Sequence, residues 1–278
     1  MRFPSLLLRT AFKGTLVAMA LAFFYEGAWA DTFTFTPSAV GLTGAAVTAD
    51  NILLSDFSSV TFTGATTFSD RGLLSITGLQ LGGWNVTAGG LNSTYSLWFT
   101  FNGTGHLTTG TSSTDPRTAV TAGVFDTLTY SLVGASGNAT FGFSGQNPTV
   151  TPGGATQTLA SGTLLNGNVA TTPANGNTAF VPTVAATVTF AIAAGKEGFF
   201  TPNPFHDKAF FAFTNAVTTV EPFGTGGPGS GFLTNNGGGN LNFVDSVLAP
   251  LPEPSTGIFV GTVLTGLDLF YWRRSRRS

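Results

Sequence analysis

The stretch YSLWFTF, residues 95–101, alternates between two faces with a period of two residues. Tyr95, Leu97 and Phe99 fall on one side, and Trp98 falls on the other. Because successive side chains of a β-strand point to opposite faces of the sheet, the pattern predicts a strand with a strongly apolar face.

The same alternation recurs through the rest of the chain body. The segments that show it are TFTFT (32–36), VTF (60–62), FDTLTYSLV (125–133), TFGFS (140–144), ATVTFAI (186–192), FFAF (210–213) and LNF (241–243). Asn-Gly pairs at 102–103 and 166–167 are typical of turns between strands. Many short strands with one buried face predict an antiparallel β-sandwich, an all-β exodomain over residues 31–247.

Two stretches of the body lack this periodicity. Residues 147–177 are rich in Gly, Thr, Asn and Pro, and they predict a long loop or a poorly patterned hairpin. Residues 221–240 contain GTGGPGSG and NNGGGN, which predict a surface loop or a cluster of turns. Either stretch could separate two sub-domains, although we favour a single domain.

The charge of the chain is low and unevenly placed. Charged residues make up 9% of the sequence, against about 25% in ordinary soluble proteins. Between residues 31 and 253, four basic residues face eleven acidic ones, a net charge of −7. Nucleic-acid binding needs clustered Lys and Arg, so we expect no nucleic-acid partner. The absence of cysteine excludes disulfides and Cys-ligated metal sites.

Residues 1–30 have the three parts of a secretory signal peptide. These parts are the basic residues Arg2, Arg9 and Lys13, the apolar run 15–25, and a small–x–small cleavage pattern at Ala28 and Ala30. We expect signal peptidase to leave Asp31 as the new N-terminus. The alternative is a retained N-terminal anchor, which the short apolar run disfavours.

Residues 248–278 begin with a proline-rich linker and end in four arginines. The apolar run between them, residues 257–272, predicts a transmembrane helix of about 24 Å, short of the roughly 30 Å hydrocarbon core. Asp268 lies about one turn from the arginines, so its carboxylate could reach towards them. The positive-inside rule predicts a cytoplasmic tail. Because the run is short, we expect it to anchor the chain in the membrane only temporarily. The alternatives for residues 257–272 are an ordinary single-pass tail anchor and a buried helix.

The tripeptide Pro-Glu-Pro at residues 252–254 is followed by the short apolar run and then by the four C-terminal arginines. These three parts in this order resemble the PEP-CTERM sorting signal. The resemblance implies a Gram-negative exporter, a transient inner-membrane intermediate, processing by an exosortase, and delivery to the cell surface or extracellular matrix. By this resemblance the sorting motif is Pro252, Glu253 and Pro254, and the stop-transfer cluster is Arg273, Arg274, Arg276 and Arg277. Asp268 departs from the wholly apolar span of the family.

The body is also similar to PEP-CTERM proteins associated with flocculation. The residues that carry this similarity are FTFTPSAVGLTGAAVTADNILLSDFSSVTFTG near residue 33 and DKAFFAFTNAVTTV with NNGGGNLNF further on. It implies a role in floc or biofilm formation together with exopolysaccharide.

Motifs for catalysis are weak throughout. GTGGPG (224–229) has nucleotide-loop spacing, but Pro228 and the lack of a following helix predict a plain loop. GFSGQ (142–146) lacks the last glycine of a nucleophile elbow. The pair His206 and Asp207 predicts a solvated turn, and His106 is isolated.

Acidic residues leave two further possibilities open. A glycoside hydrolase needs two converging carboxylates, for which Asp115, Asp126, Glu197 and Glu221 are the candidates. Asp50, Asp56 and Asp70 could bind Ca²⁺, although solvated loop acids are the favoured interpretation. We therefore predict no catalytic residue, no cofactor and no metal site.

The sequence as a whole predicts a non-enzymatic, exported structural protein of the surface or the exopolysaccharide matrix. The first alternative is a carbohydrate-binding surface adhesin that stacks Trp84 or Trp98 on sugars, although core burial is favoured for Trp98. The second alternative is a secreted hydrolase.

Overall fold

The computed structural model describes residues 31–174, 179–201, 208–214 and 220–243, with 208–214 described as backbone. These residues belong to one compact unit, Ala30–Asp245. The predicted signal peptide, the linker with the sorting signal, and the pair His206 and Asp207 lie outside the described residues. Within the described residues, no helix has the length and apolarity needed to cross a membrane.

The described unit is built almost wholly from antiparallel strands, and its only described helical element is a short 3₁₀ turn, η1 (Pro37–Val40). The all-β prediction is thus confirmed. The strands are β1 (Phe33–Phe35), β2 (Val47–Ala49), β3 (Asn51–Phe62), β4 (Thr67–Leu81), β5 (Trp84–Val86), β6 (Tyr95–Thr109), β7 (Thr121–Ser136), β8 (Thr140–Ser144), β9 (Asn147–Thr151), β10 (Thr156–Ala174), β11 (Ala179–Thr189), β12 (Ala191–Ile192), β13 (Phe200–Thr201), β14 (Lys208–Thr214), β15 (Val220–Phe223) and β16 (Gly231–Phe243).

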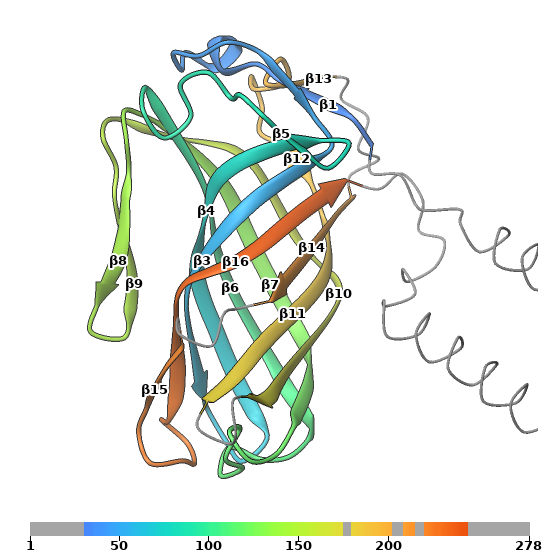
Figure 1. Cartoon of the computed structure of the whole chain (residues 1–278), viewed down its shortest axis with the longest axis vertical. Coiled ribbons are helices and arrows are strands. Elements are labelled where there is room, and N and C mark those ends of the chain that lie inside the picture. Colours follow the sequence, from blue (N-terminus) through green and yellow to red (C-terminus); the bar gives the residue numbers. More distant parts are fainter. Residues whose placement is uncertain (1–30, 175–178, 202–207, 215–219, 244–278) are drawn as a thin grey trace, which may run out of the picture. The chain divides into compact units, whose positions relative to one another are not determined.

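The principal sheet closes on itself (Figure 1). Its long strands follow one another in chain order, β3-β4-β6-β7-β10-β11-β14-β16, and each pairs antiparallel with the next. The ring closes because β16 also pairs with β3. A closed sheet of this strand number has an interior that side chains fill or that holds one small ligand.

The predicted β-sandwich is therefore replaced by a single closed sheet. A sandwich buries one face of each sheet against a second sheet, whereas here the inward faces of opposite walls pack against each other. Period-two alternation is the same in both arrangements, since it reports only that one face of each strand is buried. The alternation could not distinguish them.

A cluster of phenylalanines fills one end of the closed sheet. The small sheet β13-β1-β2 contributes Phe33, Phe35 and Phe200, which are buried in one core cluster with Phe243 of β16. Edge-to-face packing is prominent, as between Phe33 and Phe243 at 5.3 Å between ring centroids. Aromatic pairs of this geometry add stability beyond the area they bury.

The predicted strand 95–101 is buried on both of its faces. Tyr95, Leu97 and Phe99 point into the main core, while Trp98 lies on the outer face and is only 2% exposed. The hairpin β8-β9 covers this part of the outer wall, and Phe141 packs edge-to-face on Trp98 at 6.0 Å. The favoured core position of Trp98 is confirmed, so its ring is not available to stack on a sugar.

Several predicted loops and turns are strands instead. Residues 147–151 and 156–174 of the first unpatterned stretch form β9 and β10, so the long-loop alternative is wrong for most of this stretch. The Asn-Gly pairs at 102–103 and 166–167 lie inside β6 and β10. In the second unpatterned stretch only 224–230 is a turn, and 231–243 forms β16. Pairing with two neighbours supplies the hydrogen bonds that hold these Gly- and Asn-rich segments extended, against their local turn preference.

Candidate functional site

The end of the closed sheet opposite the phenylalanine cluster carries a cavity of about 420 Å³. Part of its wall is formed by two segments, the β6–β7 loop around residues 112–117 and the end of β15 with the following turn, residues 222–226. The Gly227 backbone amide donates to the Ser112 carbonyl at 3.0 Å, which ties the two loops together. Binding pockets of proteins commonly have volumes of about 300–1,000 Å³. We call this space the mouth cavity.

An ion pair between Asp115 and Arg117 lines the mouth cavity. The Arg117 guanidinium donates to both carboxylate oxygens of Asp115, each at 2.9 Å, and the Arg117 backbone amide donates to Asp115 Oδ1 at 3.0 Å. The side-chain hydrogen bonds from Arg117, followed by its backbone bond, lower the pKa of Asp115. Both groups are therefore charged at neutral pH and compensate each other within the cavity wall.

The β15–β16 turn has the glycines that its backbone requires. Gly224 has φ +74°, and a Cβ on it would lie 2.8 Å from the Ser230 backbone. Only glycine adopts this left-handed conformation without strain. The predicted plain loop at GTGGPG is confirmed, and its role in the structure is to wall the mouth cavity.

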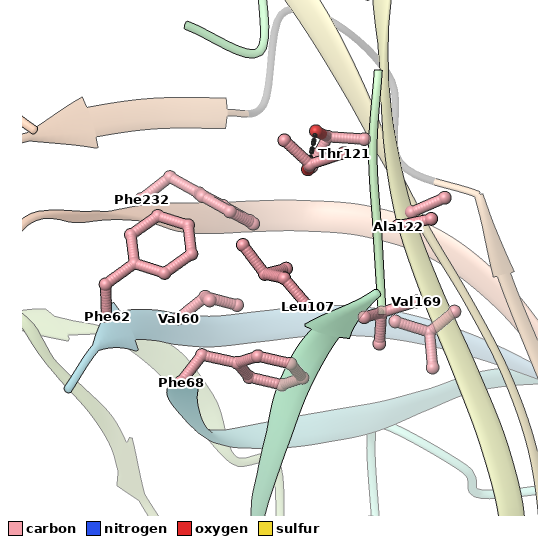
Figure 2. A pocket seen from close by; sticks show the side chains of 11 residues that line it. Val60, Phe62, Phe68, Leu107, Thr121, Ala122, Val169 and Phe232 are labelled. Carbon is pink, nitrogen blue, oxygen red and sulfur yellow. Dashed lines mark hydrogen bonds between the residues drawn. The ribbon is translucent and has the colours of Figure 1, made fainter. Parts of the chain in front are cut away.

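Two threonine hydroxyls, those of Thr121 and Thr171, lie between the mouth cavity and a smaller apolar space, which we call the apolar chamber. The Thr121 and Thr171 hydroxyls are hydrogen-bonded at 2.6 Å and buried. Figure 2 shows this bond at the edge of the chamber, whose wall includes Phe62, Phe68 and Leu107. The chamber has a volume of about 50 Å³ and an almost wholly apolar lining.

A second interior space lies deeper, between β3, β4, β6, β7 and β11, and we call it the acid cavity. Its volume is about 40 Å³, and two carboxylates line it, Asp56 from β3 and Asp70 from β4. Asp56 is 7% exposed and accepts a hydrogen bond from the Ser58 hydroxyl at 3.0 Å. Asp70 is 5% exposed, and its Oδ1 has no hydrogen-bond partner among the described residues.

These two acids correct the expectation of solvated loop acids. Phe68, Asp70, Gly72 and Leu74 share the inward face of β4 by the period of two, so extending the alternation through 67–81 would have placed Asp70 inside. Asp50 alone of the three behaves as a surface acid, and it accepts from the Gly82 amide at 2.7 Å. Among the described residues, no three metal-ligating side chains are grouped.

Burial raises the pKa of Asp70 well above its ordinary value, and the negative charge of Asp56 raises it further. The folded state therefore binds a proton at Asp70 over a pH range in which the unfolded chain has lost it. Across that range, stability falls as pH rises from the unfolded pKa of about 3.9 towards the higher folded pKa.

We therefore expect Asp70→Asn to stabilise the protein at pH 7 and to change its stability much less at pH 4. The amide keeps the shape of the carboxyl group but cannot ionise. Urea denaturation of the wild type and the variant at both pH values measures this difference. Asp126→Asn is the matched control, because Asp126 is half exposed, and an equal pH effect there would contradict the assignment.

The remaining sequence candidates lie on separate parts of the surface. His106 Nδ1 and Asp126 Oδ1 are 2.7 Å apart on the outer wall, an ion pair if the imidazole is protonated. Glu197 accepts from the Gly195 backbone amide at 3.0 Å. Glu221 lies on β15, and Trp84 on β5 is 81% exposed. Of the four carboxylates considered for glycoside hydrolysis, only Asp115 lines the mouth cavity.

The serine of GFSGQ ends β8 and the glycine after it forms the β8–β9 turn, with no strand-to-helix elbow.

The mouth cavity and the acid cavity were not identified from the sequence, because each combines residues from strands far apart along the chain. Comparisons with protein-family models, with curated proteins and with solved structures found no match to this chain.

Proposed function

We propose that this chain is an exported, non-enzymatic protein of the cell surface or extracellular matrix of a Gram-negative bacterium. A signal peptide directs export, and a C-terminal helix anchors the protein in the inner membrane until an exosortase processes it. It then supports floc or biofilm formation together with exopolysaccharide. The observation that carries the proposal is the order of the PEP motif, one short apolar span and four arginines at the C-terminus.

The outer wall of the exodomain is compatible with a polysaccharide matrix. Hydroxyl pairs lie across neighbouring strands, such as Thr104 with Thr127 at 2.8 Å on the closed sheet and Thr34 with Thr48 at 2.9 Å on the small sheet β13-β1-β2. Such a surface offers donors and acceptors to sugar hydroxyls while carrying few charges. It therefore supports hydrogen bonding to neutral polymers over ionic attachment.

Deletion of residues 252–254 is expected to leave the protein unprocessed and in the inner-membrane fraction. The exosortase would lose its recognition motif, whereas the span and the arginines would still anchor the chain. An epitope inserted at Gly145, in the exposed β8–β9 turn, permits fractionation and intact-mass measurement of the processed protein.

Deletion of residues 248–250 is the control, because it shortens the linker equally and leaves the motif intact. That variant should be processed and released like the wild type. Unchanged mass and surface release in the 252–254 deletion would refute the sorting proposal.

A carbohydrate-binding adhesin is the second candidate, and the mouth cavity favours it. Phe180 and Phe232 pack edge-to-face at 5.3 Å in its wall, beside the paired Asp115 and Arg117. An anionic ligand would compete with Asp115 for Arg117, and a cationic one would compete for Asp115. A neutral saccharide can hydrogen-bond to both groups without separating them.

For this candidate we expect Arg117→Ala to weaken saccharide binding about tenfold or more, because a charged hydrogen-bond donor is lost. Calorimetric titration with neutral oligosaccharides selected on a glycan array measures the effect. Arg71→Ala is the matched control on the outer wall, and Trp84→Ala tests the exposed ring directly. Loss of binding on Trp84→Ala alone would move the site to β5, and no saturable binding would eliminate the adhesin.

A further inference from the structure

The acid cavity combines negative charge with aromatic surface. Besides Asp56 and Asp70, its lining includes the rings of Phe99, Phe101 and Tyr130, and that of Phe125. Gly72 of β4 is two residues from Asp70, and it pairs with Ser58 of β3, which is two residues from Asp56. A Cβ at residue 72 would be 2.5 Å from the Phe101 ring. The absence of a side chain at residue 72 lets this ring approach the wall between the acids.

The acid cavity holds negative charge without a basic counterpart in its lining. Its titratable residues are Asp56, Asp70 and Tyr130, and none of the described residues that line it is basic. The Tyr130 hydroxyl donates to the Thr189 carbonyl at 2.6 Å. Asp70 lines the cavity, and its Oδ1 has no hydrogen-bond partner among the described residues. A buried polar atom without a partner is costly, and a ligand that donates a hydrogen bond to it removes that cost.

We propose that the acid cavity binds a short alkylammonium ion, with its ammonium group donating to Asp70 and its alkyl group against the aromatic rings. Aromatic faces attract organic cations, and a carboxylate accepts the ammonium hydrogen bonds strongly. A volume of about 40 Å³ suits only a few non-hydrogen atoms. A bare Ca²⁺ ion fits less well, because it takes six to eight oxygen ligands and this lining is largely apolar.

The apolar chamber adjoins the acid cavity. Val184 lines both the chamber and the acid cavity, and Phe68 of the chamber packs edge-to-face on Phe125 of the acid cavity at 5.7 Å. The chamber in turn shares Phe62, Thr121, Thr171 and Phe232 with the mouth cavity. The polar mouth cavity, the apolar chamber and the acid cavity thus neighbour one another in that order through shared lining residues.

Ionisation of Asp70 sets the pH dependence of this binding. The ionised Asp70 carboxylate accepts the ammonium hydrogen bonds more strongly than the protonated acid does, and it adds to the negative charge of Asp56. An alkylammonium stays protonated to about pH 10 by analogy with lysine. Burial and the Asp56 charge hold Asp70 protonated in the empty protein towards higher pH. The affinity should therefore increase as pH rises through the raised pKa of Asp70, with release of a proton on binding.

Calorimetric titration of the full-length protein with n-butylammonium chloride at constant ionic strength tests the proposal. We expect saturable binding, a loss of about tenfold or more on Asp70→Asn, and no effect of Asp126→Asn. The neutral n-butanol should bind at least about tenfold more weakly than the cation, since it lacks the charge. Repeating the titration in buffers of different ionisation enthalpy measures the proton release.

Three results would overturn the proposal: no saturable binding of n-butylammonium, equal binding by Asp70→Asn, or equal binding of n-butanol. Asp70→Asn is expected to fold, because it removes a buried ionisable group without changing its shape, and urea denaturation verifies this. The proposal does not depend on the export route or on saccharide binding. Failure of either of those leaves this titration unaffected.

Discussion

Phe200→Ala is expected to lower the free energy of unfolding by about 3–5 kcal/mol. The Phe200 ring is 1% exposed and packs edge-to-face on Phe190 at 5.2 Å and on Phe199 at 4.9 Å. It also contacts Phe33 and Phe243, at 5.9 and 6.0 Å between ring centroids. Truncation removes the ring from the centre of the phenylalanine cluster, and neighbours held by two sheets can collapse only partly into the space.

Urea denaturation of the purified protein, followed by tryptophan fluorescence, measures this loss. Trp84→Ala removes a ring of larger size from an 81% exposed position, and it should change stability by no more than about 0.5 kcal/mol. A Phe200→Ala variant as stable as the wild type would mean that the three-stranded sheet does not cap the closed sheet as described.

Gly162→Ala is expected to cost about 3 kcal/mol, the upper end of the usual range for overpacking. Gly162 lies in β10, and a Cβ there would be 1.8 Å from the Thr189 carbonyl oxygen and 2.6 Å from the Tyr130 ring. That carbonyl accepts the Tyr130 hydroxyl bond, so the added methyl group must displace either a paired strand or a buried tyrosine. Thermal and urea denaturation measure the loss.

Gly142→Ala is the matched control, because Gly142 also lies in a strand and no described atom is within 4 Å of its Cβ position. We expect it to be neutral or to stabilise by about 0.4–1 kcal/mol, since alanine restricts the unfolded chain. If Gly162→Ala and Gly142→Ala had the same effect, the close approach of β10 to Tyr130 would be wrong.

Strand positions followed from the sequence wherever apolar and polar residues alternate strongly, as in β6 and β7. They were missed where the strand is rich in Gly and Asn, as in β16 before the predicted segment 241–243, or where both faces are covered, as in β4. In β16 the local composition favours turns, and only the two neighbouring strands hold it extended. Tertiary pairing overrode local preference there.

The candidate sites were less accessible to sequence reasoning than the strands. Asp115 and Arg117 are two residues apart, yet the cavity they line also needs the β15–β16 turn, more than a hundred residues later. Asp56 and Asp70 looked like surface acids because charged residues are seldom buried. Their inward direction follows from strand phase, and the cavity they share follows from the pairing of β3 with β4.

By itself, the sequence predicted that the body of this chain is all-β and showed that it has little charge, and the sorting route read from its two ends stays a proposal. The tertiary structure alone decided that the strands close into one ring and that two carboxylates face its interior. The physical reason is that a period of two specifies which side chains share a face. Whether that face meets a second sheet or the opposite wall of its own sheet depends on strand register and pairing.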